Sequence, residues 1–123
     1  MKAARWITGA GSFILLATAI FHATGFVRLV KRIEASGVAY PLDGTLKATW
    51  LTFSLQILIL AVIAFLASRS ARGGWIVLLC AVSTGLTGLI LFRFLGLFVG
   101  VYLTAAVSLL FLLGGLMQAK QKA

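Results

Sequence analysis

Four long stretches without a charged residue constrain this chain more than any other feature of its sequence. They hold 22 residues between Arg5 and Arg28, 21 between Lys47 and Arg69, 20 between Arg72 and Arg93, and 26 between Arg93 and Lys120. An α-helix needs about 20 predominantly apolar residues to cross the hydrocarbon layer of a membrane. The stretches are continuously apolar, whereas the strands of a membrane barrel alternate apolar and polar residues. They therefore predict four membrane-spanning helices.

The composition indicates that lipid is the solvent for this chain. Of its 123 residues, 62% are hydrophobic and 11% are charged, and the mean hydropathy is +1.13. A single domain of this length (residues 1–123) has too much surface to hide so many apolar side chains from water. The net charge of +9 comes from Lys and Arg residues beside the spans, where they can reach lipid headgroups. We therefore expect the lipid bilayer, and not a nucleic acid, as the partner of these charges.

The spans predict helices at about residues 6–30, 46–68, 74–94 and 97–118. The first is expected to be a retained helix and not a cleaved signal peptide, because apolar residues continue past the small-residue segment "ATA" at 17–19. Short connections force neighbouring helices to pack antiparallel. The expected fold is all-α, an up-down antiparallel four-helix bundle in a membrane.

The basic residues favour one orientation of this bundle. The side that carries both termini has six of them: Lys2, Arg5, Arg69, Arg72, Lys120 and Lys122. The opposite side has five: Arg28, Lys31, Arg32, Lys47 and Arg93. Because Lys and Arg are more frequent in cytoplasmic loops, the termini are expected in the cytoplasm. We expect a bacterial-type inner membrane or an equivalent one.

The only histidine, His22, lies inside the apolar segment "AIFHATGFVRLVKR". Gly11, Thr18 and Gly25 recur every seven residues, and His22 falls on the same helix face. Small residues mark contacts between membrane helices, so His22 is expected to face another helix. Histidine titrates near neutral pH, which makes His22 a candidate acid or base. The alternative is a neutral ring that bonds to Thr18 or Gln56 and holds two helices together.

Polar residues on the other predicted helices lie at a depth similar to that of His22. At 1.5 Å per residue, His22, Gln56 and Thr84 all lie about 12 to 13 Å from the same membrane face. The ligand-binding candidates at or above this level are Gln56, Arg93, Trp50, Thr52, Thr84, Tyr102 and Thr104. Asp43 is a weaker catalytic candidate, because "PLDG" is also a turn sequence. Together they predict a polar pocket in one leaflet.

This pocket predicts binding of a lipophilic or amphipathic small molecule, with or without isomerase- or hydrolase-like chemistry at His22. Whether the protein is an enzyme stays open. A structural or accessory subunit that assembles through glycine-rich faces such as "GLTGLILF", and an oligomeric channel or transporter protomer, are the alternatives. A lone His without nearby Cys or carboxylate ligands predicts no metal, and we expect no cofactor. A lipophilic small molecule and a second copy of the chain are the expected partners besides lipid.

Overall fold

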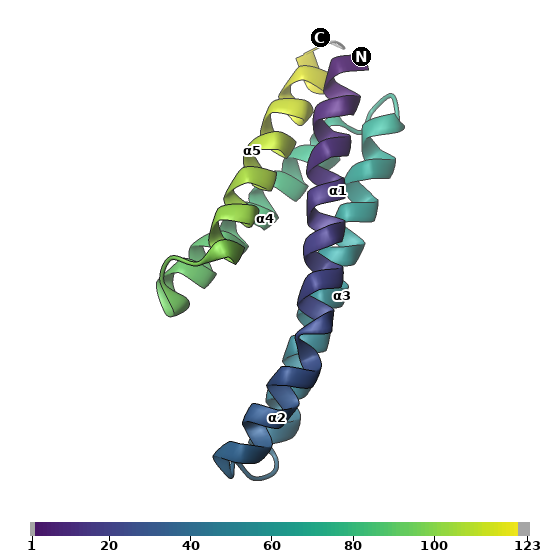
Figure 1. Ribbon diagram of the computed structural model, residues 1–123. Helices are drawn as coiled ribbons and strands as arrows, with labels where there is room; N and C mark the ends of the chain where they lie inside the picture. The colour runs from purple at the N-terminus through teal and green to yellow at the C-terminus, as the bar shows by residue number, and fades with distance from the viewer. Residues whose placement is uncertain (1, 121–123) are drawn as a thin grey trace.

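The computed structural model describes residues 2–120, and this part of the chain consists of helices joined by short connections (Figure 1). The helices are α1 (Lys2–Thr24), α2 (Phe26–Ser36), α3 (Leu42–Arg69), α4 (Gly74–Leu95) and α5 (Val99–Lys120). The α1–α2 segment forms one span, and α3, α4 and α5 form three more, each long and apolar enough to cross a membrane. The predicted all-α four-helix membrane fold is confirmed.

The helices form two closely packed pairs that meet near the termini. Helix α1 packs along α3 and α5, and α4 packs along α5, whereas α3 and α4 touch over a shorter length. The α4–α5 pair diverges from the α1–α3 pair toward the end opposite the termini (Figure 1). The buried core includes Leu15, Ala64, Val77, Val107 and Phe111. The bundle is therefore closed at the terminal end and open at the other.

Small residues bring the helices together at the closed end. A Cβ atom on Gly11 would lie 2.8 Å from Cε1 of the buried Phe111, so only glycine leaves room for this ring between α1 and α5. Gly114 on α5 likewise faces the hydroxyl of the fully buried Thr8. Without a hydrophobic driving force between helices in lipid, such close approach is what holds them.

Gln118 adds a polar tie at the same end. Its side-chain Nε2 donates hydrogen bonds to the carbonyl oxygens of Ala67, Ser68 and Ser70, at 3.3, 3.3 and 2.7 Å. The last carbonyl groups of a helix have no partner within that helix. Gln118 of α5 therefore caps the C-terminus of α3, a contact that was not predicted from the sequence.

The helix boundaries differ from the predicted ones in three places. The first span is interrupted at Gly25 and continues to Ser36, because α2 places Ile33 against α3 as a buried residue. Helix α3 begins at Leu42 and not near 46, since Pro41 stands at its N-cap and "LDG" forms its first turn. Helix α5 begins at 99 because Gly96, with φ of 72°, ends α4 and redirects the chain. Lys122, counted among the basic residues above, lies outside the described residues.

Candidate functional site

His22 lies one turn before the break in the first span and faces α3. Its Nδ1 atom is 2.8 Å from the Ser54 hydroxyl. Its ring stacks on the Trp50 indole, with 4.0 Å between ring centroids, and meets the Phe53 ring edge-on at 5.0 Å. The Ser54 hydroxyl donates to the Trp50 carbonyl at 3.1 Å, which leaves the Ser54 oxygen to accept from Nδ1–H. We therefore assign the Nδ1–H tautomer to His22.

The break at Gly25 completes this arrangement. Trp50 Nε1 donates to the His22 carbonyl at 2.8 Å, and the Gly25 amide donates to the same oxygen at 3.1 Å. A Cβ atom on Gly25 would lie only 2.8 Å from Trp50 Cζ2, so glycine is what lets the indole reach that carbonyl. His22, Ser54 and Trp50 thus form a closed ring of hydrogen bonds between α1 and α3. We call this ring the His22 clamp.

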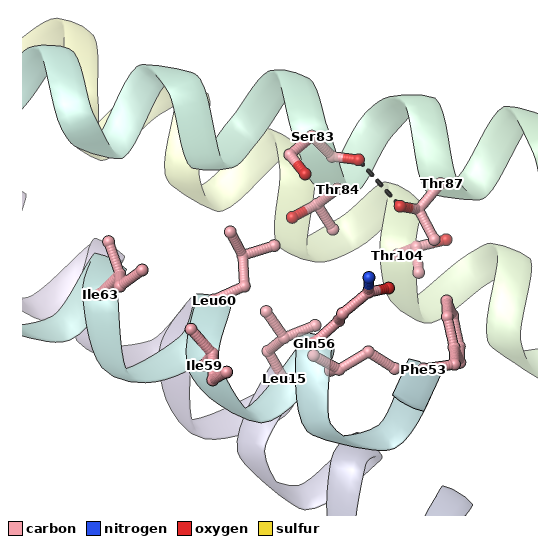
Figure 2. A pocket seen from close by; sticks show the side chains of 11 residues that line it. Leu15, Phe53, Gln56, Ile59, Leu60, Ile63, Ser83, Thr84, Thr87 and Thr104 are labelled. Atoms are coloured by element: carbon pink, nitrogen blue, oxygen red, sulfur yellow. Dashed lines mark hydrogen bonds between the residues drawn. The ribbon is translucent and has the colours of Figure 1, made fainter. Parts of the chain in front are cut away.

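A separate cleft of about 350 Å³ lies between α3 and the α4–α5 pair, where the two pairs diverge (Figure 2). One wall is polar and consists of Ser83, Thr84 and Thr87 of α4 and Thr104 of α5, with Gln56 facing them from α3. The rest is apolar and includes Leu15, Phe53, Ile59, Leu60 and Ile63. We call this the threonine cleft.

The polar groups of the threonine cleft have a definite hydrogen-bonding capacity. The hydroxyls of Thr84, Thr87 and Thr104 donate to carbonyl oxygens of their own helices at 2.8 to 2.9 Å. Their oxygen atoms still have lone pairs, so these three threonines can accept hydrogen bonds but have no free hydroxyl hydrogen, whereas the Ser83 hydroxyl can also donate. The Gln56 amide forms no hydrogen bond within residues 2–120, and it extends from α3 toward the threonines (Figure 2). It can both donate and accept.

The residues predicted to form one pocket are therefore divided between two places. Gln56, Thr84 and Thr104 line the threonine cleft, whereas His22 and Trp50 belong to the His22 clamp. Phe53 connects the two, because it lines the cleft and touches the His22 ring.

The remaining ligand-binding candidates do not line the cleft. Thr52 is exposed one turn before Gln56, and Tyr102 is 60% exposed. Arg93 is also exposed, with its guanidinium 5.8 Å from the centre of the Phe94 ring.

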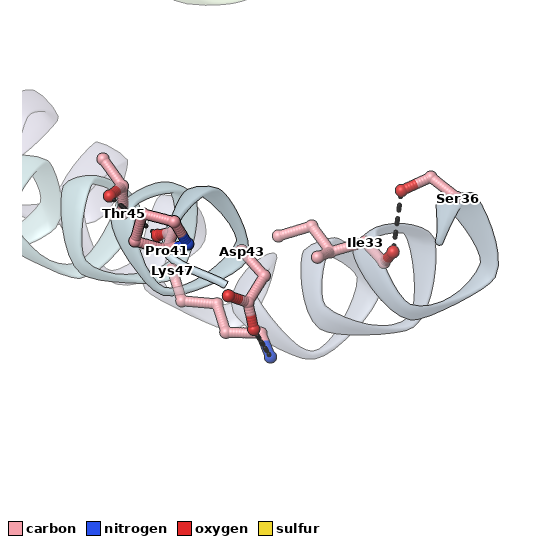
Figure 3. A network of polar contacts seen from close by, with 6 residues as sticks. All are labelled: Ile33, Ser36, Pro41, Asp43, Thr45 and Lys47. Atoms are coloured by element: carbon pink, nitrogen blue, oxygen red, sulfur yellow. Dashed lines mark hydrogen bonds and ion pairs between the residues drawn. The ribbon is translucent and has the colours of Figure 1, made fainter. Parts of the chain in front are cut away.

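Asp43 lies in the first turn of α3, next to α2 (Figure 3). Its Oδ2 atom is 3.7 Å from Nζ of Lys47, one helical turn further along. A carboxylate in the first turn of a helix is stabilised by the helix dipole, which accounts for Asp43 without a catalytic role. It does not line the threonine cleft.

Two residues of these sites were not predicted from the sequence: Ser54, the hydrogen-bond partner of His22, and Ser83 of the cleft. The signal for Ser54 was its position four residues after Trp50, which puts both on one face of α3. Within residues 2–120, no three His, Cys, Asp or Glu side chains lie close enough together to hold a metal ion.

Comparisons of the chain with protein-family models, with curated proteins and with solved structures found no match.

Proposed function

We propose that this membrane protein binds a neutral amphipathic molecule, drawn from the bilayer, in the threonine cleft. The observation that carries the proposal is the composition of the cleft: one polar wall at a single level, apolar residues on the remaining sides, and no charged residue in the lining. A charged ligand group buried there would have no partner, and that is costly in a low-dielectric medium. The ligand is therefore neutral.

The hydrogen-bonding capacity of the cleft defines the polar end of this ligand. Threonine oxygens that only accept require a donor, such as a hydroxyl or an amide N–H. The Gln56 amide would accept from or donate to the same group. The tail would run along α3 from Gln56 past Ile59 to Ile63, a distance of about 10 Å at the helical rise. A lipid with a hydroxyl or amide headgroup fits this description.

Binding without catalysis is the activity that this arrangement favours. The Nδ1 atom of His22 is hydrogen-bonded to the Ser54 hydroxyl, and the His22 ring is stacked on Trp50. The ring is also absent from the lining of the cleft. We therefore assign His22 to the joining of α1 and α3, and acid/base chemistry is not part of the proposal.

The geometry favours packing within the chain over assembly with a second copy as the role of the glycines of α4. Gly85 and Gly88 belong to the segment "GLTGLILF" that suggested self-association. A Cβ on Gly85 would lie 2.9 Å from the Ser108 hydroxyl oxygen, and one on Gly88 would lie 2.7 Å from that of Thr104. These glycines are used inside the chain, between α4 and α5.

The location is proposed with this function. A bacterial-type inner membrane or an equivalent one would contain the four spans, with both termini in the cytoplasm. Support comes from the sequence, in which six Lys and Arg residues lie on the side predicted to carry the termini and five on the opposite side.

A photoreactive probe tests the ligand proposal. The probe is a long-chain primary alcohol with a diazirine in its chain, and the comparison probe is the corresponding methyl ether, which cannot donate a hydrogen bond. Each is added to proteoliposomes, cross-linked by light and mapped by peptide mass spectrometry. We expect the alcohol to label peptides of α3 around Ile59 and Ile63 several-fold more than the ether does.

Two variants and a control complete the experiment. Thr87→Val and Gln56→Leu remove polar atoms from the cleft at nearly constant volume, and both should lower labelling by the alcohol. Thr45→Val is the control, because Thr45 is exposed near the start of α3 and its hydroxyl bonds to its own helix, as that of Thr87 does. Equal labelling by both probes, or no effect of the cleft variants beyond that of the control, would refute the proposal.

A further inference from the structure

A second groove lies on the opposite side of α3, near the terminal end of the molecule. It has a volume of about 810 Å³ and runs between α1 and α3. Lys2, Arg5 and Arg69 line one part of it, and Gly9, Phe13 and Phe65 line another. A neighbouring hollow of about 230 Å³ shares Gly9, Phe13 and Phe65 and extends the groove to Leu16 and Val62. We call the combined feature the basic groove.

Within residues 2–120, the cations of the basic groove form no ion pair with an acidic side chain. Nη2 of Arg5 donates to the Arg69 carbonyl at 3.4 Å, which brings the two arginines together. The Arg69 guanidinium lies 4.3 Å from the centre of the Phe65 ring. The only acidic residues of the sequence are Glu34 and Asp43, which belong to α2 and the first turn of α3 at the far end. Two guanidinium groups and an ammonium group thus gather without an acidic side chain of the described residues beside them.

The rest of the basic groove is apolar and hollow. Phe13 is 72% exposed and Val62 is 47% exposed, so both are accessible to lipid chains. A Cβ atom on Gly9 would meet nothing within 4 Å. From Arg5 to Leu16 the groove follows α1 for about 16 Å, a distance comparable with half the hydrocarbon thickness.

We infer that the basic groove binds an anionic glycerophospholipid. Its phosphate would lie among Lys2, Arg5 and Arg69, and one acyl chain would lie along Gly9, Phe13 and Phe65 toward Leu16. Basic pockets between membrane helices attract anionic headgroups, and the cations lie where the spans reach the membrane surface. The inference is independent of the threonine cleft, which lies on the other side of α3.

Native mass spectrometry tests this inference. The protein in a neutral detergent is titrated with phosphatidylglycerol and phosphatidylcholine of identical chains. We expect the wild type to prefer phosphatidylglycerol. Each basic side chain near a membrane surface contributes about fivefold in affinity, so Arg5→Gln/Arg69→Gln should lower phosphatidylglycerol affinity on the order of 25-fold. The control Arg28→Gln/Arg32→Gln removes two charges at the far end and should leave the affinity unchanged.

The acyl-chain part of the groove has its own variant. Gly9→Leu fills the hollow without a clash at Cβ and should lower phosphatidylglycerol affinity several-fold, with all cations retained. Ala17→Leu places the same leucine side chain at an exposed position of α1 outside the groove and serves as the control. If both double arginine variants lost phosphatidylglycerol affinity equally, only the net charge of the protein would matter, and the inference would be overturned. Unchanged affinity in Gly9→Leu, or displacement of the lipid by millimolar inorganic phosphate, would overturn the assignment to a lipid.

Discussion

At the scale of single residues, the His22 clamp shows how a membrane interior accommodates polar groups. At the break at Gly25, the His22 carbonyl accepts a hydrogen bond from the Trp50 indole, and the His22 ring forms a hydrogen bond with the Ser54 hydroxyl. A polar group left without a partner in hydrocarbon is costly, so each of these contacts supports the others.

Replacing His22 should separate the hydrogen bond from the ring stacking. His22→Asn keeps a donor near the position of Nδ1, whereas His22→Leu removes it; both remove the ring that stacks on Trp50. Hydrogen bonds between membrane helices contribute on the order of 1 kcal/mol, so His22→Leu should be less stable than His22→Asn by about that amount. Unfolding in detergent followed by circular dichroism measures the difference. A double-mutant cycle that combines His22→Leu with Ser54→Ala is the control. If the two losses of unfolding free energy simply add, the hydrogen bond between His22 and Ser54 is contradicted.

Gly25→Ala should displace the Trp50 indole, because the added Cβ would lie 2.8 Å from Cζ2. The indole N–H would lose the His22 carbonyl, and its NMR resonance should shift and exchange faster with water. Gly44→Ala is the control, since a Cβ there has open space. An unmoved indole resonance in Gly25→Ala would contradict the close contact.

The sequence predicts that His22 faces another helix, but it does not predict which residue it meets. Gln56 was a proposed partner because of its depth. In the structure, α3 is oriented so that Ser54 faces α1, while Gln56, two residues further along, faces the threonine cleft. The orientation of α3 about its axis depends on packing between side chains of distant segments, so it cannot be predicted from a local sequence pattern.

At the scale of helices, lipid makes the spans easier to predict than their ends. A charged residue inside the hydrocarbon is expensive, so uncharged stretches mark the spans well. Outside the hydrocarbon this constraint disappears. The segment "KRIEAS" was predicted to be a loop, yet it is helical because Ile33 packs against α3 while its charged neighbours face outward.

The contact between α1 and α5 should be sensitive to a single methyl group. Gly114→Ala would push against Thr8 and should destabilise the fold by about 1 to 3 kcal/mol, as overpacking does. Gly9→Ala adds the same methyl group on α1 in open space and should not lower the stability of the fold, since alanine is the better helix former. Thermal unfolding of both variants in one detergent measures this, and equal stability would exclude a tight α1–α5 contact.

At the scale of the whole molecule, the divergence of the two helix pairs decides where a ligand can lie. Residues at equal depth were expected to meet in one pocket. Gln56 and the threonines instead line the opening between α3 and the α4–α5 pair, whereas His22 packs on another face of α3. Depth follows from helical rise, whereas divergence follows from crossing angles, which the sequence does not reveal.

Membrane orientation can be measured with single cysteines. The native Cys80 is 3% exposed and should give little background. With the termini in the cytoplasm, a membrane-impermeant maleimide should label Ala35→Cys in intact spheroplasts and Ala71→Cys only in inverted vesicles. Ala35 and Ala71 are both exposed, at opposite ends of the bundle. The reverse pattern would place the termini outside.

The exposed side of the threonine cleft has a consequence for how binding must be measured. Ile59 and Ile63 are 48% and 42% exposed within a span, so this side of the cleft meets acyl chains and not water. A ligand would then exchange by lateral diffusion within one leaflet. Occupancy should follow its mole fraction among the lipids: doubling the lipid at a constant amount of probe should lower subsaturating labelling about twofold, whereas doubling the buffer volume should not.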